Sequence, residues 1–244
     1  MKKPLIYLSG LLLLSSCATP SANAISFPKA IASAKELDKY QFEISLVVDK
    51  EIAMSSACDV EISSLKMRCT AELDGESGEY LSDLSTGAIY YALDTPLSSD
   101  RDPSIPENIK WVKVESDLAV PQFSSPVASN PLAILDSIEE LNPTEVSDLS
   151  RNGETYKGYK VNIPKDKNPS ELPLSNQESP DSGLYLILYI DTSSSLRGIV
   201  YSLGPDIPKG TVEIWINDAS FESISMPAPE TVISYDDLEG FSFK

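Results

Sequence analysis

The side chains that could do chemistry in this chain are limited by its composition, which includes three cysteines and no histidine. Without imidazole, no Ser-His-Asp or Cys-His nucleophile can be assembled, and no histidine-based zinc or iron site can form. One nucleophile pattern remains, Ser63-Ser64-Leu65-Lys66, which fits S-x-x-K, but its partner motifs are absent and it falls in a predicted hairpin turn. The sequence therefore predicts a non-enzymatic protein with no catalytic residue, no metal ligand and no cofactor.

The first cysteine, Cys17, ends a segment typical of export. Lys2 and Lys3 precede an apolar stretch, residues 5–14, which is too short for the roughly 20 residues of a membrane-spanning helix. The Leu-Ser-Ser-Cys segment that ends at Cys17 resembles the lipobox of bacterial lipoproteins, in which the cysteine thiol accepts a diacylglyceryl group. We predict a signal peptide over residues 1–16 and a lipid anchor on Cys17.

A second cleavage site remains open beside the lipobox. Ala22-Asn23-Ala24 is an A-x-A site for conventional processing, which would give a soluble secreted protein. Residues 17–28 are rich in Ala, Ser, Pro and Thr and are predicted to be a flexible tether. Residues 29–244 are predicted to form a single domain on the extracytoplasmic face of the cell membrane.

The chain is strongly acidic, with a formal net charge of -18. Removal of residues 1–16 takes away two lysines and no acid, which brings the mature chain to about -20. Such a chain repels phosphate backbones and anionic lipid headgroups, so nucleic-acid binding is excluded and the acyl anchor must hold the protein to the membrane. We expect a monomer whose excess of acid serves solubility.

The other two cysteines fit one hairpin register. With a tight turn at Ser63-Ser64, Cys58 lies opposite Cys69, close enough for a disulfide in an oxidising compartment. The same register places Asp59 opposite Arg68, Glu61 opposite Lys66, Val60 opposite Met67 and Ile62 opposite Leu65. We predict a structural Cys58–Cys69 disulfide; two free buried thiols are the alternative.

Apolar periodicity predicts further elements. Helices are expected over 28–39, with Ile31, Ala34 and Leu37 buried, and from Asn130 as N-cap, with Leu132, Leu135 and Ile138 buried and Ile134 and Leu141 beside them. Strands are expected from Tyr40 and over 88–93, 110–115, 156–163, 184–191, 196–203 and 211–217. Residues 184–190 are apolar on both faces, so protein or an apolar ligand must cover each side.

The order of these segments resembles the actinobacterial LppX/LprG lipoproteins, whose fold is like that of the lipoprotein carrier LolA. The matching segments are Ala30 to Tyr40, Ile109 to Val114, Asn130 to Leu135, Gly153 to Val161, Leu188 to Arg197 and Phe221 to Pro229. They span most of residues 30–235 in the same order. The cysteine pair, the long polar loops and the acidity depart from the family pattern.

This resemblance implies an α+β fold, a strongly curved antiparallel half-barrel with helices over its concave face and an apolar cavity between them. The candidate cavity residues are Leu132, Leu135, Ile138, Leu186 and Leu188. The implied function is a membrane-anchored envelope protein that binds or carries an apolar lipid or glycolipid moiety. The alternative is a non-catalytic surface interaction or sensor-like module with no open cavity.

Overall fold

The computed structural model describes residues 25–48, 51–73, 76–93, 105–115, 130–138, 142–163, 184–203 and 210–238. The predicted signal peptide, Cys17, the first part of the tether and Leu141 lie outside these residues. Within the described ranges, no helix is long and apolar enough to cross a membrane.

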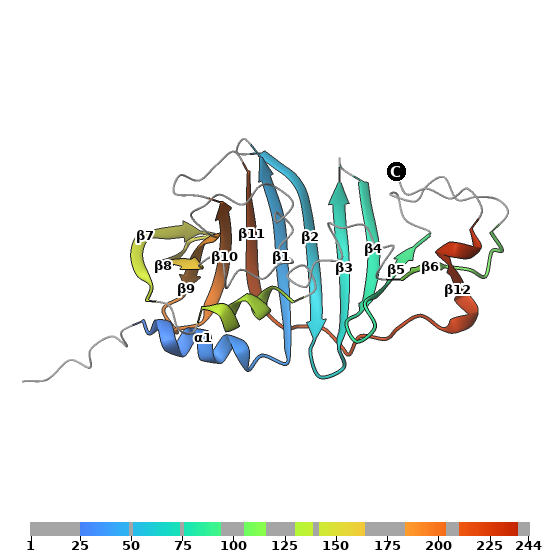
Figure 1. The fold of residues 1–244 in the computed structure, drawn as a ribbon, viewed down its shortest axis with the longest axis horizontal. Coiled ribbons are helices and arrows are strands. Elements are labelled where there is room, and N and C mark those ends of the chain that lie inside the picture. The colour runs from blue at the N-terminus through green and yellow to red at the C-terminus, as the bar shows by residue number, and fades with distance from the viewer. Residues whose placement is uncertain are drawn as a thin grey trace, which may run out of the picture.

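The strands of the described residues form one open 12-stranded sheet (Figure 1), in the order β12-β6-β5-β4-β3-β2-β1-β11-β10-β9-β8-β7. Their bounds are β1 Lys39–Val48, β2 Glu51–Glu61, β3 Lys66–Leu73, β4 Glu76–Asp83, β5 Ala88–Ala92, β6 Trp111–Val114, β7 Thr144–Arg151, β8 Glu154–Ile163, β9 Leu184–Ile190, β10 Leu196–Leu203, β11 Gly210–Asp218 and β12 Val232–Ser234. Neighbouring strands pair antiparallel, except β12 and β6, which are parallel.

The described helices are few: α1 Phe27–Lys35, and the 3-10 helices η2 Pro131–Ser137, η4 Pro229–Thr231 and η5 Tyr235–Asp237. The large, mostly antiparallel sheet agrees with the predicted class. That the sheet is a half-barrel with helices over its concave face stays a prediction.

Helix α1 begins where its N-cap is satisfied, because the hydroxyl of Ser26 accepts a hydrogen bond from the backbone N–H of Lys29 at 3.4 Å. Its buried residues are Ala30, Ile31 and Ala34. The helix ends at Lys35, four residues before the predicted end, so Leu37 does not join the buried face and keeps 38% of its surface exposed.

Helix η2 is shorter than predicted and is a 3-10 helix. Asn130 is the N-cap and Pro131 the first helical residue, as predicted. Its bonds span three residues, such as that from the Ile138 N–H to the Leu135 carbonyl at 3.0 Å. Because seven residues make only about two turns, packing of the apolar side chains decides the conformation more than helix propagation does.

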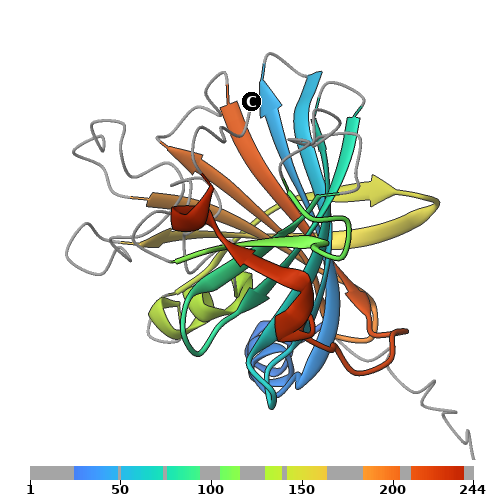
Figure 2. The same ribbon diagram turned by 90° about the vertical axis from the view of Figure 1, so that its right-hand side faces the viewer.

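The central strands present two different faces. Phe42 on β1 pairs with Ile216 on β11, and both are buried in the main core together with residues of α1 and η2. We call this the core face. Glu43 and Trp215, the next pair in the register, point to the opposite side, the outer face. Figure 2 shows η2 and the β7–β8 hairpin on opposite sides of the sheet.

The predicted β2–β3 hairpin is correct in register. Cys58 pairs with Cys69, Asp59 with Arg68 and Val60 with Met67. The disulfide is present, with an S–S distance of 2.03 Å and a Cα–Cα distance of 4.1 Å. The predicted charge pair of Glu61 differs: although Lys66 lies opposite it, Glu61 forms its ion pair with Lys39 at 2.8 Å.

The C-terminal segment after β11 explains this exchange of partners. It crosses the ends of the central strands to reach β12 (Figure 1), and its Ser223 hydroxyl and Ile224 N–H donate to Glu61 at 3.1 and 3.2 Å. Lys66 meanwhile donates to the Ile224 carbonyl at 3.2 Å. The paired charges of the hairpin therefore hold a segment about 160 residues away, which no local pattern could predict.

Candidate functional site

The five predicted cavity residues come together in one apolar layer on the core face. Leu132, Leu135 and Ile138 lie on or directly after η2, while Leu186 and Leu188 lie on β9. Leu132 is 7% exposed and the other four have no exposed surface. They belong to the same core as Ala30, Ile31 and Ala34 of α1. The layer is closed over these side chains in the structure.

The two helices meet at a seam with a hollow of about 120 Å³. Its walls are mainly Ala34, Leu37, Ile62 and Leu132. Lys35 of α1 bridges the seam to Asp136 of η2 at 3.0 Å, and Asp136 is 80% exposed. The hollow adjoins the apolar layer, because Leu132 lines both.

A second polar contact fixes the start of η2. The hydroxyl of Tyr40, at the start of β1, donates to Oδ1 of Asn130 at 2.9 Å, and the same oxygen accepts the Leu132 N–H at 3.2 Å. Burial raises the pKa of Tyr40 well above its usual value, so this hydroxyl stays a neutral donor. Helix η2 is therefore held to its neighbours by apolar packing and two polar contacts.

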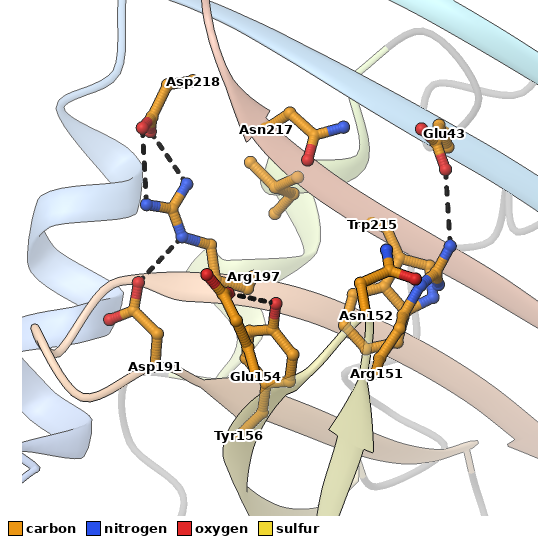
Figure 3. A pocket seen from close by; sticks show the side chains of 11 residues that line it. Glu43, Arg151, Asn152, Glu154, Tyr156, Asp191, Arg197, Trp215, Asn217 and Asp218 are labelled. Carbon is orange, nitrogen blue, oxygen red and sulfur yellow. Dashed lines mark hydrogen bonds and ion pairs between the residues drawn. The ribbon is translucent and has the colours of Figure 1, made fainter.

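The outer face carries a different site, a polar pocket of about 310 Å³ beneath the tip of the β7–β8 hairpin (Figure 3). Its floor is Trp215 on β11, whose ring lies against Gly198; a Cβ at Gly198 would stand 2.9 Å from the indole. Tyr156 and Tyr189 also contact the indole, with ring centroids 5.6 and 5.8 Å away.

β7 and β8 bend towards the outer face (Figures 1 and 2), with a bulge between Val146 and Leu149, and this bend brings the hairpin tip to the pocket. Gly158 permits the bend, since a Cβ there would lie 2.7 Å from the Ser147 carbonyl oxygen. Arg151 at the end of β7 then stacks over Trp215 at 4.1 Å and contacts Glu43 of β1 at 3.4 Å. In the sheet order, β7 is five strands away from β1.

The opposite side of the pocket is an arginine held between two carboxylates. Arg197 donates to Asp191 at 2.9 Å and to Asp218 at 2.8 Å, and these bonds, first that to Asp218, raise the pKa of the guanidinium. Glu154 accepts the Tyr156 hydroxyl at 2.7 Å, which raises the pKa of Tyr156 (Figure 3). The pocket is thus a preorganised set of charged and aromatic groups.

This pocket was not predicted from the sequence. Its residues come from β1, β7, β8, β10 and β11 and share no motif. The nearest signal was the apolar run at residues 184–190, which required a cover on each face. The structure supplies the second cover, since Ile187 and Val200 form a small cluster with Val146 and Tyr189 on the outer face.

The described residues contain no candidate metal site. Over the ranges of the chain that the structure describes, no group of three or more Cys, Asp or Glu side chains is placed to hold a metal ion. The S-x-x-K segment lies in the turn between β2 and β3, where the hydroxyls of Ser63 and Ser64 donate to Asp38 and Glu61 at 3.0 and 2.9 Å.

Comparison with known proteins gives likeness in fold only. No family model matches the chain, and no curated protein matches it by sequence. Among solved structures, LprF from Mycobacterium bovis is 15% identical with a TM-score of 0.48, covering 86% of this chain and 98% of LprF. LppX from Mycobacterium tuberculosis is 14% identical with a TM-score of 0.45, covering 79% of this chain and 95% of LppX.

A LolA superfamily protein from Nitrosomonas europaea also matches, at 10% identity and a TM-score of 0.30, covering 83% of this chain and 96% of that protein. The chain is similar, over most of the length of each, to these two mycobacterial lipoproteins and this LolA superfamily protein. At these identities, roles in binding or transport are not carried over.

Proposed function

We propose that this chain is a membrane-anchored lipoprotein of the cell envelope that takes up an apolar lipid or glycolipid moiety between its helices and the core face of its half-barrel sheet. The lipid on Cys17 holds it to the extracytoplasmic face of the membrane, and it works without catalysis, cofactor or metal. The observation that carries this proposal is the apolar layer under η2, formed by Leu132, Leu135, Ile138, Leu186 and Leu188.

Access to that layer requires η2 to move, because four of the five side chains have no exposed surface. The helix is short, and across the seam from α1 it is held by one ion pair, Lys35–Asp136, with a largely exposed carboxylate. An exposed ion pair contributes only about 0–1 kcal/mol. The seam is therefore the place where the layer opens at the lowest cost in polar contacts.

Burial of a lipid chain is large enough to stabilise the open form. An acyl chain of about 16 carbons gains on the order of 10 kcal/mol when it leaves water, at about 0.8 kcal/mol per CH₂, before the costs of association. When η2 separates from the sheet, the apolar surface of both becomes exposed, and the acyl chain of the lipid then covers it. Lipid contacts then replace the protein contacts that η2 makes in the closed form.

A second function is favoured by a single observation, the complete burial of Leu135, Ile138, Leu186 and Leu188. If this packing is permanent, the chain is a non-catalytic surface interaction or sensor-like module without an open cavity. The two functions differ in one respect, which is whether Leu135 ever contacts lipid.

Two matched variants separate these functions. Leu135→Trp places a bulky side chain in the layer, and Leu81→Trp makes the same change at a buried leucine on β4 outside the main core. Each protein is purified from its own host membranes, and its lipid is extracted and quantified by mass spectrometry. The carrier predicts lipid with the wild type and with Leu81→Trp and its loss from Leu135→Trp.

The stability of both variants is measured alongside. Overpacking a core costs about 1–3 kcal/mol, so both variants are expected to be destabilised by similar amounts. Absence of lipid from the wild type, or equal lipid in all three proteins, would contradict the carrier function and support the interaction module.

Anchoring is tested separately at Cys17. Cys17→Ala removes the only thiol that the signal peptidase pathway can acylate at this site, so the protein should leave the membrane fraction or remain unprocessed. Normal processing with retention in the membrane would refute the anchor without deciding the fate of the apolar layer.

A further inference from the structure

A second hollow lies beside the polar pocket on the outer face. It measures about 440 Å³, lies over β1 to β4 and shares Glu43 and Asn217 with the pocket of Figure 3. The two hollows adjoin at Glu43 and Asn217, and together they make an elongated depression on the outer face. We call it the outer-face groove.

The groove follows a single row of residues across six strands. In register, Glu79 pairs with Thr70, Thr70 with Ala57, Ala57 with Glu43, Glu43 with Trp215, and Trp215 with Gly198. Ala57 and Thr70 are short and exposed, so they leave a depression between Glu79 and Glu43. Six strands at about 4.8 Å spacing span about 24 Å, the length of roughly seven extended residues.

The charges of the groove favour a cationic occupant. Its walls hold six carboxylates, Glu43, Asp59, Glu79, Glu154, Asp191 and Asp218, against three guanidinium groups, Arg68, Arg151 and Arg197. Among the described residues, no Lys or Arg forms an ion pair with Glu79 or Glu154. The excess negative charge lies on a chain whose net charge is already -18.

One arginine of the chain itself shows which group the groove accepts. Arg151 stacks on Trp215 at 4.1 Å and contacts Glu43 at 3.4 Å, and its side chain remains 33% exposed. An aromatic face with a carboxylate beside it is a favourable environment for a guanidinium or ammonium group. The long ion pair and the exposure of Arg151 allow this side chain to give way to another cation.

We propose that the outer-face groove binds an extended segment of a protein partner that carries several arginine or lysine side chains. The segment crosses the strands from Glu79 to Trp215, and its cations pair with Glu79, Glu43 and Glu154. This site lies on the face opposite the apolar layer, so one chain would hold a lipid on its core face and a basic protein segment on its outer face.

The test uses an acetylated heptapeptide of alternating glycine and arginine with three arginines, labelled with fluorescein, and the processed full-length protein in detergent at low ionic strength. Fluorescence anisotropy gives the affinity. We expect the triple variant Glu43→Gln, Glu79→Gln, Glu154→Gln to bind about 10-fold more weakly, because it removes three exposed ion pairs, each of which contributes little on its own.

A matched triple variant controls for net charge. Glu36→Gln, Glu107→Gln and Glu230→Gln make the same change at exposed positions outside the groove, and should alter the affinity by less than about 2-fold. Equal weakening in both triple variants would show that only the overall charge attracts the peptide and would overturn the proposal. Free arginine that competes as well as the peptide at equal arginine concentration would also overturn it.

Arg151 provides a test in the opposite direction. Arg151→Ala vacates Trp215 and should tighten peptide binding about 3-fold, beyond the effect of Lys29→Ala, which removes the same charge from α1. If the two variants bind the peptide equally, the peptide does not occupy the position on Trp215, and the proposal that the segment reaches this residue is wrong.

Discussion

The core face and the outer face of β9, β10, β11 and β1 are covered in opposite ways. On the core face, α1 and η2 bury a continuous apolar layer that includes Leu188, Ile214 and Phe42. On the outer face, a bent hairpin of the same sheet covers a small apolar cluster at Ile187 and Val200, and beside it Trp215 is surrounded by charge. Adjacent residues of one strand therefore face different environments, an apolar core on one side and a partly charged surface on the other.

The core face can change its cover without unfolding the sheet. The cover of the core face consists of separate short helices, whereas the cover of the outer face is part of the sheet through the β7–β8 ladder. A helix can move while every strand keeps its hydrogen bonds. This difference supports the proposal that lipid binds at the core face and a protein segment at the outer face.

The largest expected effect comes from truncating neighbouring residues of β9 on the two faces. Leu188→Ala should cost about 2–5 kcal/mol of unfolding free energy, because this fully buried side chain lies in the main core. Ile187→Ala should cost less, at the low end of that range, because its cluster has two buried members among the described residues. Urea unfolding monitored by circular dichroism measures both, and equal losses would show that the two faces are equally cohesive.

A somewhat smaller effect is expected at the bend of the hairpin. In Gly158→Ala, the new methyl group would stand 2.7 Å from a backbone oxygen and from Val146, so the hairpin must shift at a cost of about 1–3 kcal/mol. Because Arg151 sits at the end of this hairpin, Trp215 fluorescence should change as well. In a Trp111→Phe background, which leaves Trp215 as the sole tryptophan, an unchanged spectrum would contradict the role given to the hairpin.

The stability that Glu61 contributes by holding the C-terminal segment should depend on pH. Hydrogen bonds from Lys39, then Ser64, lower the pKa of Glu61 from 4.5 to about 2, although burial acts in the opposite direction. A lowered folded-state pKa means that the stabilising contribution is fully present above about pH 4.5 and is lost as the pH falls towards about 2. The stability difference between the wild type and Glu61→Gln should shrink over that window; a difference independent of pH would contradict the contacts of Glu61.

The smallest effect on stability is expected at the seam. Asp136→Asn breaks the ion pair with Lys35 and should cost about 0–1 kcal/mol, because the carboxylate is 80% exposed. If this pair holds the layer closed, lipid exchange should nevertheless become faster. Transfer of a fluorescent fatty acid between protein and vesicles measures the rate, and an unchanged rate would move the opening away from this seam.

Some parts of this structure follow from local sequence and others do not. The β2–β3 register was predictable because the cysteine, charge and apolar pairs agree on one alignment. Strands β4 and β7 were not predicted, since Glu76–Asp83 and Thr144–Arg151 are mostly polar and do not alternate with apolar residues. The end of α1 was also misplaced, because Leu37 keeps the helical spacing but lies beyond the last turn.

The two sites also differ in how far local sequence predicts them. The five candidate cavity residues were named from helix periodicity, the apolar run and the family resemblance; all five belong to the main buried core, and a cavity there stays a prediction. The outer-face groove depends on contacts such as Arg151 with Trp215 and Arg151 with Glu43, which join residues 64 and 108 positions apart. Contacts of this kind arise from the bend of a hairpin and have no signature in either segment.

Native mass spectrometry of the protein released intact from the membranes of its own host would show whether the chain carries a lipid. If the chain is a lipid carrier, the spectrum should contain a covalent lipid on Cys17 and, in addition, a non-covalent lipid that dissociates on activation. The same non-covalent lipid should be absent from Leu135→Trp and present in Leu81→Trp. A wild-type protein that carries the covalent anchor and no bound lipid would contradict the claim that the apolar layer opens.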